Sequence, residues 1–99
     1  MKTIHVAGGS FFTGTEIADA VMTYSLELAR AELLDIVEIP FIGADGTTQR
    51  AQIRVGWRID TIVTFTYGEV QELIDAEASF ALIDKTELLH TRRLDSDHD

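Results

Sequence analysis

Residues 5–17, HVAGGSFFTGTEI, decide how this chain begins to fold. They start inside an apolar run, residues 2–7, which predicts a β-strand that stops at two consecutive glycines, Gly8 and Gly9. A third glycine, Gly14, stands just before a run with helical periodicity. Glycine-rich turns between a strand and a helix often hold phosphates. The stretch therefore predicts either a phosphate site or a plain turn followed by a helix.

Two local signals mark the start of the predicted helix. Thr13 and Glu16 have the spacing of a capping box, in which each side chain accepts a hydrogen bond from the other residue's N–H. Phe12 and Ile17 have the spacing of a hydrophobic staple. An apolar stripe at helical spacing follows, with polar residues such as Glu27 on the opposite side; it is formed by Ile17, Val21, Tyr24, Leu28 and Ala31.

The middle of the chain predicts strands and a hairpin. Residues 35–42 have strand composition, and Pro40, which lacks an N–H, suits an edge or the end of that strand. Asp45 and Gly46 form a dipeptide that is typical of hairpin turns. Apolar and polar side chains alternate over residues 50–57, and residues 59–66 predict a further strand.

The C-terminal third predicts a second helix. After Gly68 the apolar spacing becomes helical, whereas residues 80–83 fit either a continuation of this helix or a short strand. We expect residues 95–99 to form a flexible acidic tail. Residues 1–94 are then one small α+β domain of two layers. A mixed, mainly antiparallel sheet of three to four strands carries helices on one face, in the order βαβββα.

Composition places the chain among small globular proteins. Its 99 residues, 45% hydrophobic and 25% charged, suffice for one modest core. It has no cysteine, which excludes disulfides and thiolate metal sites and fits a reducing cytoplasm. The formal net charge of −9 opposes binding to nucleic acid, and no apolar run approaches the length of a membrane span. We expect a soluble cytoplasmic protein with neither nucleic-acid nor membrane partners.

The spacing from Gly9 to Thr15 is that of a phosphate-binding P-loop with one residue missing. Thr15 directly follows Gly14, so the lysine that would hold the β- and γ-phosphates is absent, and Glu16 comes next. What remains is a candidate site for a small anion or nucleotide at a helix N-terminus, formed by Gly8, Gly9, Gly14 and Thr15.

The run VAGGSFFTG resembles the GGxGFxG turn of extended short-chain dehydrogenases and epimerases. The resemblance implies that Gly8, Gly9 and Gly14 approach a dinucleotide pyrophosphate and that Glu38 binds its ribose. The match covers about the first 40 residues. Phe11 stands where that family has its middle glycine, and the chain has no Tyr-x-x-x-Lys pair. We therefore expect no cofactor.

Residues that could perform catalysis or hold a metal are few. His5 and Ser10 are close enough to pair, but no nucleophile motif surrounds them. Asp95, Asp97 and Asp99 have the spacing that opens an EF-hand loop, yet the chain ends before the glycine and glutamate of that loop. We expect no catalytic residue and no metal site, and we favour a protein that is not an enzyme.

Positive charge is concentrated in one segment. Over residues 47–58 the only charged side chains are Arg50, Arg54 and Arg58. Strand spacing puts Arg50 and Arg54 on one face, and Arg58 joins them only if the strand continues past Gly56. The three arginines are candidate interface residues.

Met22 and Leu26 fall between the two faces of the first helix and are further interface candidates. Together with the arginines, they favour a module that forms a homodimer or binds another protein. The alternatives are a small-anion or nucleotide binder at the glycine-rich helix start, and an acidic protein that mimics nucleic acid.

Overall fold

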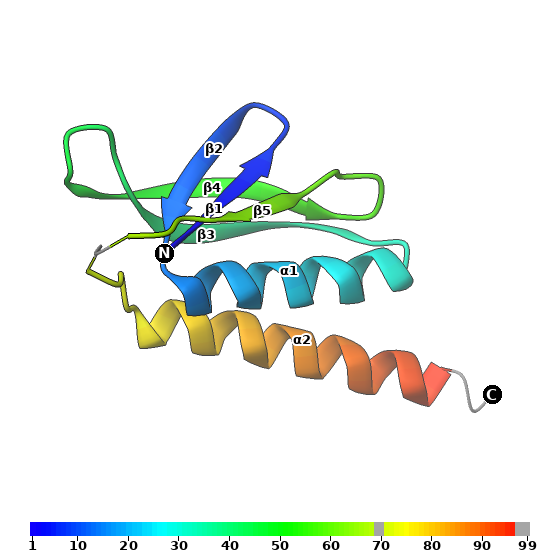
Figure 1. The fold of residues 1–99 in the computed structure, drawn as a ribbon. Helices are drawn as coiled ribbons and strands as arrows, with labels where there is room; N and C mark the ends of the chain where they lie inside the picture. Colours follow the sequence, from blue (N-terminus) through cyan, green and yellow to red (C-terminus); the bar gives the residue numbers. More distant parts are fainter. Residues whose placement is uncertain (69–70, 97–99) are drawn as a thin grey trace.

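A computed structural model describes residues 1–68 and 71–96 of the chain. Its elements follow one another in the order ββαβββα (Figure 1). They are β1 (Lys2–Val6), β2 (Gly9–Thr13), α1 (Thr15–Arg30), β3 (Leu34–Ile42), β4 (Thr48–Gly56), β5 (Ile62–Phe65) and α2 (Ala76–Ser96).

The strands form one sheet in the order β4-β3-β2-β1-β5. Every strand pair in the described part of the chain is antiparallel. The α+β class and the placement of the helices on one face of the sheet are confirmed. The sheet has five strands, however, instead of the expected three to four. The expected order βαβββα lacks β2: β1 leads into a second strand, and the first helix follows that strand.

The stretch that was predicted as a turn and a helix start contains β2. Gly8 adopts φ 98° in the turn, and Val6 pairs with Gly9 across it. The hydroxyl of Thr13 does not cap the helix; it donates to the carbonyl of Pro40 at 2.7 Å. The N-cap is Gly14, with no side-chain cap. The predicted capping box is therefore wrong, because pairing with β1 keeps the chain extended through Thr13.

The sheet is almost divided between β2 and β3. These strands share one bridged pair, Phe12 and Ile42. Pro40 has no N–H with which to continue the ladder, and the hydroxyl of Thr13 donates to its carbonyl instead. Since β3 and β4 are paired along their whole length, they form a long hairpin, and the β1–β2 hairpin lies at an angle to it (Figure 1).

The two helices lie on the same side of the sheet. α1 packs against the strands, and α2 lies on the outer side of α1 (Figure 1). Leu82 is the one apolar side chain of α2 that is fully buried among the described residues. The rest of the core comes from α1 and the strands: Ile4, Ile17, Ala18, Ala20, Val21, Tyr24, Leu28, Val37, Ile39, Ile53 and Val55. Most apolar side chains of α2 are consequently left at the surface.

The second helix begins later than the sequence indicated. The helical spacing begins after Gly68, but α2 starts only at Ala76, and Ile74, which precedes it, is exposed. Residues 80–83 are helical. α2 includes Asp95 and Ser96, the first two residues of the expected tail, while residues 97–99 lie outside the described range.

Within the described range, neither helix combines the length and the hydropathy that a membrane crossing requires.

Candidate interaction surfaces

Strand β5 forms an edge of the sheet with a bare apolar surface. Among the described strands it pairs with β1 alone, so its other edge presents unpaired backbone groups. Ile62, Phe65 and Tyr67 are 61%, 63% and 92% exposed. Ile62 pairs with His5 and lies on the face opposite the core, whereas Phe65 pairs with Lys2 and lies on the helix side. Residues 61–67, TIVTFTY, contain no charge, no proline and no glycine. Charged residues and proline usually protect an exposed edge strand from pairing with other strands. Because residues 61–67 include neither, this edge is open to a further strand.

The apolar surface of β5 continues onto α1. The ammonium of Lys2 lies 4.5 Å from the centre of the Phe65 ring and 2.6 Å from the carboxylate of Asp19. These contacts place the Asp19 side of α1 next to β5. Met22 and Leu26 follow Asp19 by three and seven residues, which puts them on that same side, and both are exposed. The two candidate interface residues of α1 thus adjoin the β5 edge.

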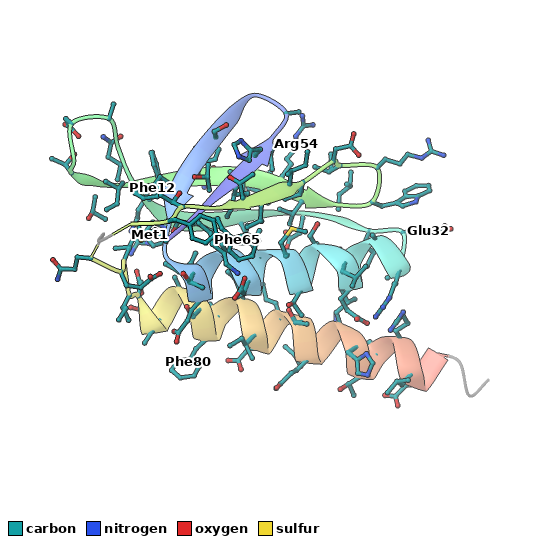
Figure 2. The ribbon with its side chains drawn as sticks, in the orientation of Figure 1. Met1, Phe12, Glu32, Arg54, Phe65 and Phe80 are labelled. Carbon is teal, nitrogen blue, oxygen red and sulfur yellow. The ribbon has the colours of Figure 1, made fainter. Side chains whose placement is uncertain are left out.

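The opposite edge of the sheet, β4, carries arginines. Arg50 and Arg54 are exposed, and Figure 2 shows Arg54 at the outer surface. Arg50 lies 3.5 Å from Asp75. β4 ends at Gly56, which has φ 117°, so Arg58 does not join the other two; its guanidinium stacks on the preceding indole at 4.4 Å. Charged side chains of this kind protect an exposed strand from pairing with another chain.

The structure separates the four residues that were predicted to hold an anion. Gly8 and Gly9 lie at the β1–β2 turn, whereas Gly14 and Thr15 lie at the start of α1. The strand between the two pairs spans about 17 Å at the usual rise of an extended chain. The four residues therefore do not form one site, and only Gly14 and Thr15 are at a helix N-terminus.

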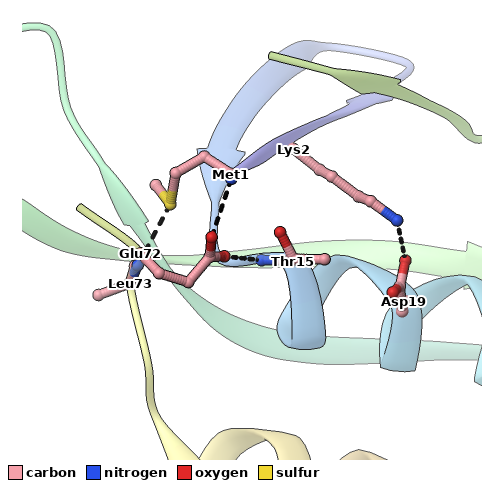
Figure 3. A network of polar contacts seen from close by, with 6 residues as sticks. All are labelled: Met1, Lys2, Thr15, Asp19, Glu72 and Leu73. Carbon is pink, nitrogen blue, oxygen red and sulfur yellow. Dashed lines mark hydrogen bonds and ion pairs between the residues drawn. The ribbon is translucent and has the colours of Figure 1, made fainter. Parts of the chain in front are cut away.

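A carboxylate of the chain itself occupies the N-terminus of α1 (Figure 3). Glu72 accepts a hydrogen bond from the N–H of Thr15, and the Met1 ammonium lies 3.0 Å from its other oxygen. The N–H of Leu73 donates to the Met1 sulfur at 3.2 Å. A side chain on Gly14 would collide with the Leu73 carbonyl. The hydrogen bond from Thr15, and then the ammonium, lower the pKa of Glu72 to about 2. The anion that a helix N-terminus favours is thus supplied internally.

A groove of about 700 Å³ runs between α1 and α2. Its apolar lining comes from Ala20 on α1 and from Ala76, Phe80 and Ile83 on α2. Figure 2 shows Phe80 on the outer side of α2, pointing away from the sheet. Ser79 also lines the groove; its side chain is buried, and its hydroxyl has no hydrogen-bond partner in the described structure. No lysine or arginine is among the lining residues, whose charged members are Glu16, Asp19 and Glu87.

A cluster of polar side chains around the buried carboxylate of Glu27 joins α1 to the C-terminal half of α2. The Glu27 side chain is 7% exposed and lies 2.9 Å from Arg93, 3.2 Å from His90 and 3.7 Å from Arg30. The apolar stripe of α1 had placed Glu27 on the solvent side. That prediction is wrong because α2 covers this side of α1. The one sequence signal for the cluster is the pair of basic residues His90 and Arg93, spaced one turn apart on the later helix.

A second, partly buried contact ties α1 to β3. The Tyr24 hydroxyl donates to a carboxylate oxygen of Asp35 at 2.5 Å, and Lys85 of α2 lies 3.4 Å from the same oxygen. Burial, reinforced by the neighbouring carboxylate, raises the pKa of Tyr24. Burial also acts to raise the pKa of Asp35, but the hydrogen bonds from Tyr24 and the Ile36 N–H, with the charge of Lys85, lower it overall. Asp35 is therefore held as the acceptor of this contact.

His5 lies between two hydroxyl groups on the face of the sheet opposite the core. Its Nδ1 is 2.8 Å from the Ser10 oxygen, and its Nε2 is 3.0 Å from the Thr64 oxygen. His5 and Ser10 therefore meet, as the sequence allowed. A nucleophile and base also need a third group that orients the base, and no carboxylate in the described range contacts the imidazole. The arrangement links β1 to β2 and β5, the strands on either side of it.

Metal ligands are dispersed over the described residues. No group of three or more histidine, aspartate or glutamate side chains gathers within residues 1–68 and 71–96. Asp97 and Asp99 of the spacing that resembles an EF-hand start lie outside this range.

Comparison with known proteins gives no relative for this chain. It matches no protein-family model, no curated protein and no solved structure.

Proposed function

We propose that the chain is a non-enzymatic interaction module whose first partner is a second copy of itself. The observation that carries this proposal is the uncharged, unpaired edge of β5. Two copies would pair β5 with β5 in antiparallel orientation about a twofold axis. The pairing would satisfy the free backbone groups of both edges and would join the two sheets into one.

The contrast between the two edges of the sheet supports this choice. β4 carries Arg50 and Arg54 along its exposed side, whereas residues 61–67 carry no charge. An apolar edge strand without such protection is a site of uncontrolled association unless something covers it. Self-pairing covers the β5 edge with no change in the rest of the fold.

The helix layer adds area to the pairing. β5 is only four residues long, while a stable interface buries roughly 1,200–2,000 Å² in total. Met22 and Leu26 lie beside the same edge, and both are exposed. We expect these two side chains, with Phe65, to pack against their counterparts below the joined sheets.

The net charge predicts how the dimer responds to salt. Each chain carries a formal charge of −9, so two copies repel one another and added salt should strengthen the dimer. An interface built from Arg50 and Arg54 against an acidic face would weaken with salt instead. Sedimentation equilibrium at low and high salt distinguishes the two. We expect a mass of about 22 kDa, twice the 11.0 kDa chain, with tighter association at high salt.

The matched variants are Ile62→Lys, inside the proposed interface, and Ile36→Lys, outside it. Each places a lysine at an exposed strand position. Ile62→Lys should give a monomer, and Ile36→Lys should remain a dimer. The double variant Arg50→Glu and Arg54→Glu should also remain a dimer. A wild-type chain that stays monomeric at every concentration, or a dimer that salt dissociates, contradicts the proposal.

A further inference from the structure

We infer that the groove between α1 and α2 binds a basic amphipathic helix from a partner protein. This inference shares with the proposed function only the premise that the chain is an interaction module, because the groove is lined by other residues than the β5 edge. The apolar part of the lining is Ala20, Ala76, Phe80 and Ile83, and the charged part is wholly acidic. The arrangement fits apolar anchors on one face of a helix and positive side chains along its margins.

The geometry of the groove fits a helix. Its α1 side spans residues 16–23, and its α2 side spans residues 76–87. At 1.5 Å per residue these lengths correspond to roughly 12 and 18 Å, or two to three turns of a partner helix. Phe80 stands at the outer wall, where it can contact an incoming side chain. A third helix would therefore lie along the pair already present.

The acidic side chains of the groove favour a basic partner. Glu16 and Glu87 make no ion pair in the described structure, whereas Asp19 is already paired with Lys2. Two carboxylates thus remain available for lysine or arginine. A second copy of this chain would present the same acidic helices to the groove, and like charges would oppose it. The net charge of −9 would also steer a basic partner toward this protein.

The unpartnered hydroxyl of Ser79 is an independent sign that the groove is incomplete. Ser79 is 6% exposed, and its oxygen has no hydrogen-bond partner within the described range. Buried polar groups nearly always have a partner. A polar or cationic side chain that enters the groove beside Ile83 would supply one.

A 14-residue peptide of leucine and lysine, with its leucines on one helical face, provides the probe. It should bind one per chain in calorimetry, with affinity that falls as salt rises. Backbone NMR shifts should concentrate at Ala20, Thr23, Ser79 and Ile83. A leucine–glutamate peptide with the same apolar face, or a scrambled leucine–lysine peptide, should bind at least tenfold more weakly. If either control peptide binds as tightly as the leucine–lysine peptide, the inference is wrong.

Variants locate the site. Phe80→Ala and Ile83→Ala change exposed side chains and should each weaken peptide binding about fivefold to tenfold. The pair Glu16→Gln and Glu87→Gln should weaken it to a similar extent. The charge-matched control pair Glu38→Gln and Asp60→Asn, on exposed residues outside the groove, should have no effect. Unchanged affinity in the groove variants overturns the inference.

The same variants separate this inference from the dimer. Ile62→Lys should abolish the dimer and keep peptide binding, whereas Phe80→Ala should keep the dimer and weaken peptide binding. A chain that binds the peptide as a monomer supports the groove and contradicts self-association. A dimer that ignores the peptide supports self-association and contradicts the groove.

Discussion

The carboxylate of Glu72 accepts a hydrogen bond from the backbone N–H of Thr15, 57 residues earlier in the chain. The contact fixes the segment before α2 against the first turn of α1. It also places a negative charge at the positive end of that helix, where a local capping residue was expected. The start of α1 is thus completed by tertiary structure.

Replacement of Glu72 by glutamine should show a specific dependence on pH. The pKa of Glu72 is about 2 in the folded chain against 4.5 as its ordinary value. Folding therefore gains stability from the ionised form above pH 4.5, and this gain is lost as the pH falls toward 2. Because the side chain is partly exposed, we expect Glu72→Gln to cost about 1 kcal/mol at pH 7. Urea unfolding from pH 7 to pH 2 should show the difference shrinking; a difference that is constant with pH contradicts this account.

The same contact predicts that small anions do not bind at the start of α1. Glu72 already holds the Thr15 N–H, and the Leu73 carbonyl lies against Gly14. Phosphate, ATP and NAD should therefore leave the melting temperature unchanged in thermal-shift measurements at constant ionic strength. A saturable rise in melting temperature with any of them would support the alternative of an anion or nucleotide binder.

The Glu27 cluster predicts how the second helix is held. Glu27→Gln removes the carboxylate that faces Arg93 and Arg30, and should cost about 2 kcal/mol, since it leaves the partly buried guanidinium of Arg93 without a counter-ion. Glu87→Gln, on the exposed part of α2, is the matched control and should cost less than about 0.5 kcal/mol.

Hydrogen exchange locates the effect of Glu27→Gln. Amides of α2 near His90 should lose protection, whereas amides of β3 and β4 should keep it after correction for global stability. Equal stability of Glu27→Gln and Glu87→Gln, or a uniform loss of protection over the chain, contradicts the role assigned to this cluster.

The parts of the fold that depend on local pattern were predictable from the sequence. Ala51, Ile53 and Val55 alternate along β4 and do face the core. Gly46 adopts φ 82° in the turn that its Asp-Gly pair predicted. The apolar stripe of α1 also packs inward, because its spacing matches the helical repeat over four turns.

The parts that depend on distant residues were not predictable. Thr13 has the local signature of a helix cap, but its partner is the Pro40 carbonyl, which becomes available only when β3 lies beside β2. Glu27 is polar and follows the polar side of α1, yet α2 buries it. The openness of the β5 edge likewise depends on the strand order of the whole sheet, although its uncharged sequence was visible.

Disulfide trapping tests self-association through β5 most directly, because the chain has no cysteine of its own. Single cysteines replace Ile62, Thr64 or Thr66 along the β5 edge, with Gln52→Cys and Arg54→Cys on the β4 edge as controls; all five positions are exposed. Neighbours across an antiparallel pair lie about 4.5–5.5 Å apart, within the reach of a disulfide. Under mild oxidation, at least one β5 variant should become a covalent dimer in near-complete yield, while both β4 variants remain monomers. Cross-linking at β4 with none at β5 would contradict the account.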